Sequence, residues 1–143
     1  MSAEQVRETM QSYVSALLDR GDYRRFFADE IEVSIVGTDQ QARGSEAAEQ
    51  MIRFMHQVAF DARPEISNLV ADDAGAAAEA VFEGTHIGEF AGVPASGQRV
   101  RVPYSVFYEL RDGKITALRL YMSLDELVRQ IGQPQSTVAT PAA

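Results

Sequence analysis

Apolar residues recur along this chain at the two spacings that distinguish helices from strands. In residues 3–19 they return at steps of three and four, the helical period, at Val6, Met10, Tyr13, Val14 and Leu17. A second stripe follows Ser45, a good helix N-cap, and runs through Met51, Ile52, Met55, Val58 and Ala59. The pattern predicts two amphipathic helices, with a short helix after Asp22 between them.

Strict alternation of apolar and polar residues replaces the helical period elsewhere. Residues 30–36 alternate in this way and predict a half-buried strand. Further strands are predicted at 65–70, 76–87, 98–110 and 114–122, and Asp112-Gly113 forms a hairpin turn between the last two. A final helix should begin after Ser123 and end at Gly132. We expect one domain over residues 1–132 and a loose tail over 133–143.

The order of these elements indicates an α+β fold. A curved antiparallel sheet would wrap around the N-terminal helices, because helices set apart from the strands in sequence pack on one face of the sheet. A sheet bent around a long helix leaves a cavity at its open end. We therefore expect a hydrophobic pocket for a small apolar molecule.

Composition excludes several classes of function. The chain has 143 residues and a net charge of −8, so it should repel phosphate backbones, and we expect no nucleic acid partner. No apolar run reaches membrane-spanning length and no signal peptide is visible, which predicts a cytoplasmic protein without a membrane partner. With no cysteine and two histidines, no metal site and no cofactor are expected.

Several segments, taken in order, resemble the SnoaL-like polyketide cyclases and bacterial ester cyclases of the nuclear-transport-factor-two-like superfamily. The stretch Phe82-Glu83-Gly84-Thr85-His86-Ile87-Gly88-Glu89-Phe90-Ala91-Gly92-Val93-Pro94-Ala95-Ser96-Gly97 is the most specific of them. The others lie at 19–22, 27–30, 43–47, 112–115 and 127–132. The resemblance covers about residues 3–132.

The resemblance implies a cone-shaped α+β barrel that is usually a homodimer through the outer face of the sheet. It also implies cofactor-free intramolecular aldol closure of an aromatic polyketide ester, with a carboxylate on the last strand as the base. This chain departs there, since Leu118, Arg119 and Leu120 stand where the ester cyclases have His-Trp-Asp. Residues 120–125 also resemble limonene epoxide hydrolases, but the Arg–Asp pair of those enzymes is not recognisable.

A two-residue turn at Asp112-Gly113 predicts which residues of the two hairpin strands lie opposite each other, and hence which share a face of the sheet. Counting back from it pairs Ser105 with Leu120 and Phe107 with Leu118. The family's placement of its carboxylate then turns this face toward the pocket, and Tyr104, Tyr108, Arg119 and Tyr121 outward. The predicted substrate-binding residues are Phe54, Met55, Phe82, Ser105, Phe107, Leu118, Leu120 and Met122.

His86 and Tyr13 are the predicted catalytic residues. An imidazole exchanges protons near neutral pH, and Glu83 or Glu89 could orient His86; the alternative is a hydrogen-bonded histidine with no catalytic task. The Tyr13 hydroxyl, or Ser105, could polarise a carbonyl, whereas the alternative for Tyr13 is core packing. Arg101 and Arg119 could hold a ligand carboxylate or form salt bridges at a dimer interface. His56 fits a favourable interaction with a helix C-terminus.

The leading hypothesis is therefore a SnoaL-like enzyme, an isomerase or lyase, that cyclises or isomerises a hydrophobic, polyketide-like carbonyl compound by acid–base chemistry. Because the position of the family's base is Leu120, a non-catalytic binding or dimerisation module is the alternative. Epoxide hydrolysis ranks third.

Overall fold

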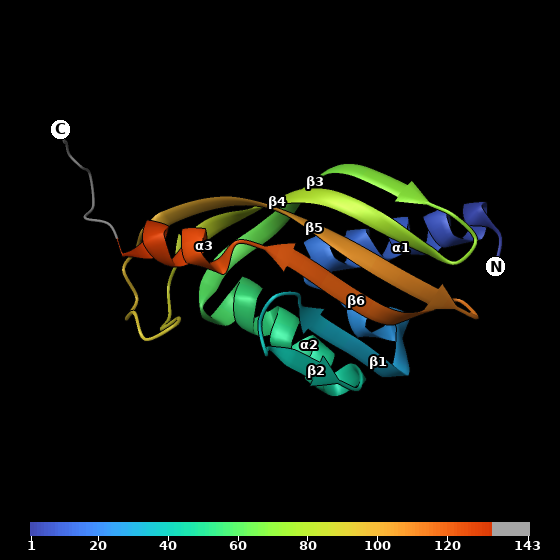
Figure 1. Cartoon of the computed structure of the whole chain (residues 1–143), viewed down its shortest axis with the longest axis horizontal. Coiled ribbons are helices and arrows are strands. Elements are labelled where there is room, and N and C mark those ends of the chain that lie inside the picture. The colour runs from blue at the N-terminus through green and yellow to red at the C-terminus, as the bar shows by residue number, and fades with distance from the viewer. Residues whose placement is uncertain (133–143) are drawn as a thin grey trace.

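Two long strands and their neighbours curve over a layer of helices in the computed structural model, which describes residues 1–132 (Figure 1). The helices are α1 (Ala3–Leu18), α2 (Ser45–Arg53) and α3 (Leu124–Ile131), with a short 3₁₀ helix η1 (Tyr23–Phe26). A π-helical turn, η2 (Phe54–Val58), continues α2 directly. The predicted tail at 133–143 lies outside the described residues.

One mixed sheet of six strands has the order β2-β1-β6-β5-β4-β3. All neighbouring strands are antiparallel except the pair β1 and β6, which is parallel. The sheet is curved and does not close on itself, so the predicted cone-shaped α+β architecture is confirmed. The strands are β1 (Phe27–Ile35), β2 (Gln41–Arg43), β3 (Phe60–Ala71), β4 (Gly75–His86), β5 (Arg99–Arg111) and β6 (Lys114–Met122).

The predicted apolar stripes are the faces that pack against the sheet. In α1, Val6, Met10 and Tyr13 are almost completely buried. A capping box starts this helix: the Ser2 hydroxyl accepts from the Gln5 backbone N–H, and the Gln5 side chain accepts from the Ser2 N–H. The buried face of α1 includes Tyr13, whose ring packs against Tyr108 of β5.

The third strand begins earlier than predicted, at Phe60 instead of near Pro64. A proline usually interrupts a sheet because it has no backbone N–H to donate. Here β3 is the edge of the sheet, where a missing donor disrupts no ladder. Pro64 therefore lies inside the strand, opposite Phe82.

The predicted register of the β5–β6 hairpin is wrong. A bulge between Glu109 and Leu110 leaves one extra residue in β6, so that Tyr108 faces Leu118 and Val106 faces Leu120. Because side chains alternate between faces, a shift of one residue exchanges the two faces of β5. Ser105 and Phe107 consequently lie on the outer face, and Phe107 is 50% exposed.

Ion pairs cover part of this outer face. Arg101 pairs with Glu83 at 3.1 Å and with Glu65 at 3.6 Å, and Arg119 pairs with Glu109. Both arginines therefore have partners within their own chain. The exposed rings of Phe107 and Tyr121 lie on the same face, and the homodimer through it stays a prediction.

Gly84 of β4 lies where β4 and β3, the edge strand, pack closely, opposite Ala62. A Cβ on Gly84 would lie 2.3 Å from the Asp61 carbonyl oxygen and 2.6 Å from the Ala62 Cα atom. Since backbone atoms cannot move aside easily, we expect Gly84→Ala to lower the free energy of unfolding by about 1–3 kcal/mol. The control is Gly132→Ala, whose Cβ would approach no atom closer than 3.4 Å. If urea denaturation shows the same free energy of unfolding for both variants, the close approach of β3 and β4 at Gly84 is wrong.

Candidate functional site

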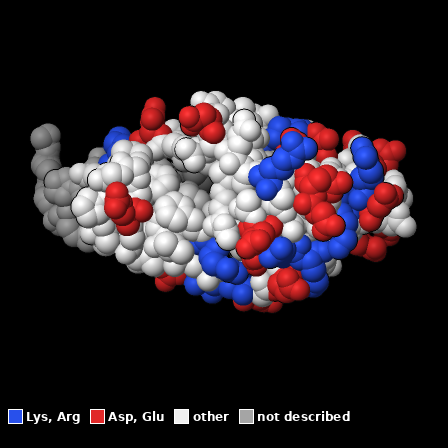
Figure 2. Space-filling model, turned by 90° about the horizontal axis from the view of Figure 1, so that it is seen from below, with Lys and Arg blue, Asp and Glu red and all other residues white. Residues whose placement is uncertain are grey.

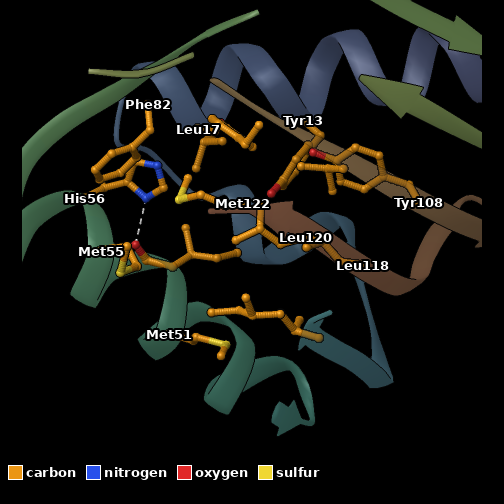
Figure 3. A pocket seen from close by; sticks show the side chains of 15 residues that line it. Tyr13, Leu17, Met51, Met55, His56, Phe82, Tyr108, Leu118, Leu120 and Met122 are labelled. Atoms are coloured by element: carbon orange, nitrogen blue, oxygen red, sulfur yellow. Dashed lines mark hydrogen bonds between the residues drawn. The ribbon is translucent and has the colours of Figure 1, made fainter. Parts of the chain in front are cut away.

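A mostly apolar cavity of about 80 Å³ lies between the concave face of the sheet and the helices. Figure 3 shows His56 with Phe82 at one end and Tyr13 with Tyr108 at the other, with Leu17, Leu120 and Met122 between them. The lining comes from α1, β1, the α2–η2 helix, β4, β5 and β6. It consists of Tyr13, Leu17, Val33, Ile35, Met51, Ile52, Met55, His56, Phe82, Tyr104, Val106, Tyr108, Leu118, Leu120 and Met122.

The structure brings most of the predicted site residues to this cavity. Of the predicted set, those that line it are Tyr13, Met55, Phe82, Leu118, Leu120 and Met122. Phe54 lines a neighbouring cavity instead. Ser105 and Phe107 are on the opposite side of the sheet because of the hairpin bulge. In their place β5 contributes Tyr104, Val106 and Tyr108, and the outward facing predicted for these two tyrosines is wrong.

Three tyrosine hydroxyls are the principal hydrogen-bond donors in the cavity. Tyr13 comes from α1 and meets Tyr108 of β5 edge to face, with 6.0 Å between ring centroids. Burial raises the pKa of Tyr13, Tyr104 and Tyr108, and the neighbouring tyrosines raise the pKa of Tyr13 and Tyr108 further. All three therefore stay protonated at neutral pH, and none donates to another described residue. Such hydroxyls can bind and polarise a carbonyl oxygen.

His86 is completely buried but does not line the cavity. Its Nδ1 accepts a hydrogen bond from the Ser96 backbone N–H at 3.1 Å and lies 2.8 Å from the Ser96 hydroxyl. Its ring packs on Phe60 with 5.2 Å between centroids. An accepting Nδ1 places the ring proton on Nε2, so Nε2 of His86 offers no lone pair to a ligand. His86 holds the loop that returns from β4 to β5.

The second histidine, His56, lines the inner cavity, although the sequence predicted for it only an interaction with a helix C-terminus. Its Nδ1 lies 2.8 Å from the Ile52 carbonyl oxygen. A carbonyl can only accept, so Nδ1 carries the proton and the neutral ring has its lone pair on Nε2. Although His56 as a whole is half-buried, Nε2 is shielded from solvent and has no partner among residues 1–132. The sequence held a signal for this placement, because His56 lies at helical spacing on the same apolar stripe as Ile52, Met55 and Ala59.

The pKa of His56 is lowered from its ordinary value. Burial is the main cause, because it disfavours the charged imidazolium; the positive charge of Arg20 lowers the pKa further, and the bond to Ile52 opposes the shift. The Arg20 guanidinium donates to the carbonyls of His56 and Ala62 and to the Asp61 carboxylate. It thereby joins the end of α1 to η2 and β3. His56 is neutral at neutral pH.

A second cavity of about 310 Å³ adjoins the first and opens toward α3. The two cavities share three side chains, those of Ile35, Met51 and Met55. Methionine side chains are flexible, so the side chains of Met51 and Met55, which separate the two cavities, can move when a ligand enters. Figure 2 shows that the α3 end of this face is hollowed and carries fewer charges than the opposite end. The remaining lining residues are Gln40, Phe54, Phe90, Ala91, Leu124 and Val128.

Carboxylates are missing from both cavity linings. Within residues 1–132, no group of three histidine, aspartate or glutamate side chains could hold a metal ion. No described helix is long and apolar enough to span a membrane. Within the described part of the chain, the polar groups of the inner cavity are therefore His56 and the three tyrosines.

A family model described as SnoaL-like polyketide cyclase matches residues 7–131. Among solved structures, a protein from Jannaschia sp. CCS1 provisionally described as a SnoaL-like polyketide cyclase gives a TM-score of 0.81 at 24% identity, over 92% of this chain and 94% of that one. TsrD from Streptomyces laurentii gives 0.76 at 26% identity, over 92% and 98%. An LEH-like epoxide hydrolase from M. tuberculosis gives 0.69 at 20% identity, over 91% and 90%. The search of curated proteins found no match.

The shielded, neutral state of His56 predicts a pH dependence of stability. The unfolded chain binds a proton at the ordinary histidine pKa near 6.5, whereas the folded chain resists it until a lower pH. Stability is therefore full above about pH 6.5 and falls toward pH 5, by at most about 1.4 kcal/mol per pH unit. His56→Asn keeps a donor for the Ile52 carbonyl but cannot titrate. Urea denaturation should show a flatter profile for the variant over this range, and parallel profiles would contradict the assignment.

Proposed function

The chain belongs to the SnoaL-like polyketide cyclase family, and on that basis we propose that it catalyses cofactor-free cyclisation or isomerisation of a small hydrophobic carbonyl compound. The observation that carries the proposal is the apolar inner cavity with tyrosine hydroxyls at one end and a histidine at the other. Apolar walls bind the carbon skeleton of such a compound, and the few polar groups orient it.

The tyrosine hydroxyls would bind the carbonyl that is attacked during ring closure. Negative charge develops on that oxygen as the new carbon–carbon bond forms. Fixed donors in a site of low polarity stabilise this charge more than water does, because they need no reorganisation. Tyr13 and Tyr108 belong to different elements, α1 and β5, and their rings are in contact. Tertiary packing therefore holds these donors in place before a substrate binds.

The size of the two cavities indicates how a substrate would fit. The inner cavity, at about 80 Å³, is smaller than pockets that enclose a drug-sized molecule, typically about 300 Å³ or more. The neighbouring cavity of about 310 Å³ has the room that the inner one lacks. We therefore propose that the reacting end of the substrate enters past Met51 and Met55 and that its remaining apolar part stays in the outer cavity.

The lack of carboxylates favours this chemistry over epoxide hydrolysis. That reaction, as the resemblance implies it, needs an Asp and an Arg–Asp pair, and neither cavity is lined by an acidic residue. A non-catalytic binding module is the second candidate, favoured by Leu120 at the position of the family's base. Measuring whether the protein converts a substrate to product distinguishes such a binding module from an enzyme. Aryl β-dicarbonyl compounds with a further ketone placed to close a six-membered ring with the carbon between the two carbonyls should give cyclised products by liquid chromatography and mass spectrometry.

Binding to the inner cavity can be tested with 2-naphthol, a planar apolar enol, by fluorescence titration. We expect saturable binding that Leu120→Phe weakens at least about tenfold, because the larger ring occupies a cavity this small. Ser105→Ala is the matched control on the other face of the hairpin and should leave the affinity within about twofold. The reverse pattern, with Ser105→Ala weakening the complex and Leu120→Phe having no effect, would refute the placement of the site.

A further inference from the structure

We propose that His56 is the general base of this site and that it takes a proton from a carbon flanked by two carbonyl groups. The inference rests on the proposed function, since it names the base and the kind of carbon acid for that same cavity. It differs from the carboxylate base that the family resemblance implies, because it places the base on the helix that continues α2 instead of on the last strand.

The first support is the position of the lone pair. His56 lines the inner cavity, and the Ile52 carbonyl holds its proton on Nδ1, so Nε2 is the accepting nitrogen. No described residue donates to Nε2. A buried polar atom without a partner costs about 1–3 kcal/mol. A ligand that donates a hydrogen, or gives up a proton, would satisfy this nitrogen.

The contrast with His86 supports the same assignment. Both histidines have a shielded Nε2 without a partner, but their rings are opposite tautomers. The Ser96 N–H donates to Nδ1 of His86, so its Nε2 carries a proton, whereas Nε2 of His56 carries a lone pair. Of the two, only His56 lines the cavity. Of the two histidines, His56 is therefore the one that presents a nitrogen lone pair to the cavity.

Local geometry fixes the ring in this orientation. The turn η2 is a π-helix, closed by a hydrogen bond from the Ala59 N–H to the Phe54 carbonyl at 2.8 Å. Such turns are rare and occur often at functional sites. The Phe82 ring packs against the imidazole edge to face, with 5.6 Å between centroids, and Arg20 binds the His56 carbonyl. The ring is thus held from the backbone, from β4 and from the end of α1.

The charges around His56 determine which proton it can take. Arg20 is the charged side chain that lowers its pKa, and Arg20 in turn forms an ion pair with Asp61. The other titratable groups of the cavity are the neutral hydroxyls of Tyr13, Tyr104 and Tyr108. An imidazole in these surroundings is always free to accept a proton but is a weak base. A hydrogen between two carbonyls is acidic enough for it, whereas a hydrogen beside one carbonyl is much less acidic.

The proposed step balances without a cofactor. The C–H bond breaks, its proton goes to Nε2, and its electron pair becomes an enolate. The enolate carbon attacks a third carbonyl, elsewhere in the same substrate, and forms the C–C bond that closes the ring, while the C=O π pair of that carbonyl moves to its oxygen beside the tyrosine hydroxyls. Water protonates that oxygen, and His56 returns its proton to solvent. The Ile52 carbonyl accepts from Nδ1–H throughout, so the charged ring keeps one hydrogen bond.

The first test uses the whole protein without any substitution. A long-range ¹H–¹⁵N spectrum at pH 7.5 should show the neutral ring of His56 protonated on Nδ1, whereas the Ser96 N–H that donates to Nδ1 of His86 predicts a proton on Nε2 of that ring. Spectra of His56→Asn and His86→Asn assign the two signals. An Nε2-protonated His56 would overturn the proposal whatever the substrate is.

The second test measures carbon acid exchange with a defined probe. Loss of the C3 hydrogen of 2,4-pentanedione in D₂O is followed by ¹H NMR, with and without protein. We expect acceleration above the buffer rate that falls at least about 100-fold in His56→Asn and persists in His86→Asn, the matched control outside the cavity. The accelerated rate should rise with pH through the titration of His56 and then level off.

The outcomes separate this inference from the proposed function. Equal exchange in wild type and His56→Asn, with 2-naphthol still bound in the cavity, would refute the base and leave the pocket in place. Failure of both 2-naphthol binding and exchange would refute both. Circular dichroism checks that His56→Asn is folded; if it is not, the tautomer in the unmodified chain still decides the question.

Discussion

The bulge in the β5–β6 hairpin is the constraint on which this site depends. One additional residue in β6 near Ala117 shifts every later pair of the hairpin by one position. Since side chains alternate strictly between the faces of a sheet, the bulge decides which half of β5 meets the helices. With it, Tyr104, Val106 and Tyr108 close the cavity, and Phe107 turns outward. Without it, the cavity would contain Ser105 and lose two of its three tyrosine hydroxyls.

Most of the architecture could be predicted from the periodicity of apolar residues. The stripe through Val6, Met10 and Tyr13 predicted α1 and its buried face, and Asp112-Gly113 predicted the hairpin turn. The register could not be obtained by counting from that turn, because a bulge leaves little trace in sequence. The strand's own alternation was the better signal: Val100, Val102, Val106 and Leu110 all belong to the face that is buried in the structure.

The candidate site was harder to predict than the fold. Sequence reasoning selected His86, whose neighbourhood matches the family best, yet the structure encloses it against Phe60 and Ser96. His56 was assigned to a helix terminus because its residue type suits one. The two histidines differ in the tautomer of the ring. The Ile52 carbonyl sets the tautomer of His56, and the backbone N–H of Ser96, ten residues away, sets that of His86. Such contacts become visible only when the backbone is placed in space.

Together these features describe a family scaffold in which the base would have moved from a strand to a helix. A crystal structure of the protein with 2-naphthol tests this account most directly. We expect the hydroxyl-bearing ring to enter the inner cavity, with the hydroxyl within about 2.6–3.2 Å of His56 Nε2. A ligand on the outer face beside Phe107, or a hydroxyl directed away from His56, would contradict it.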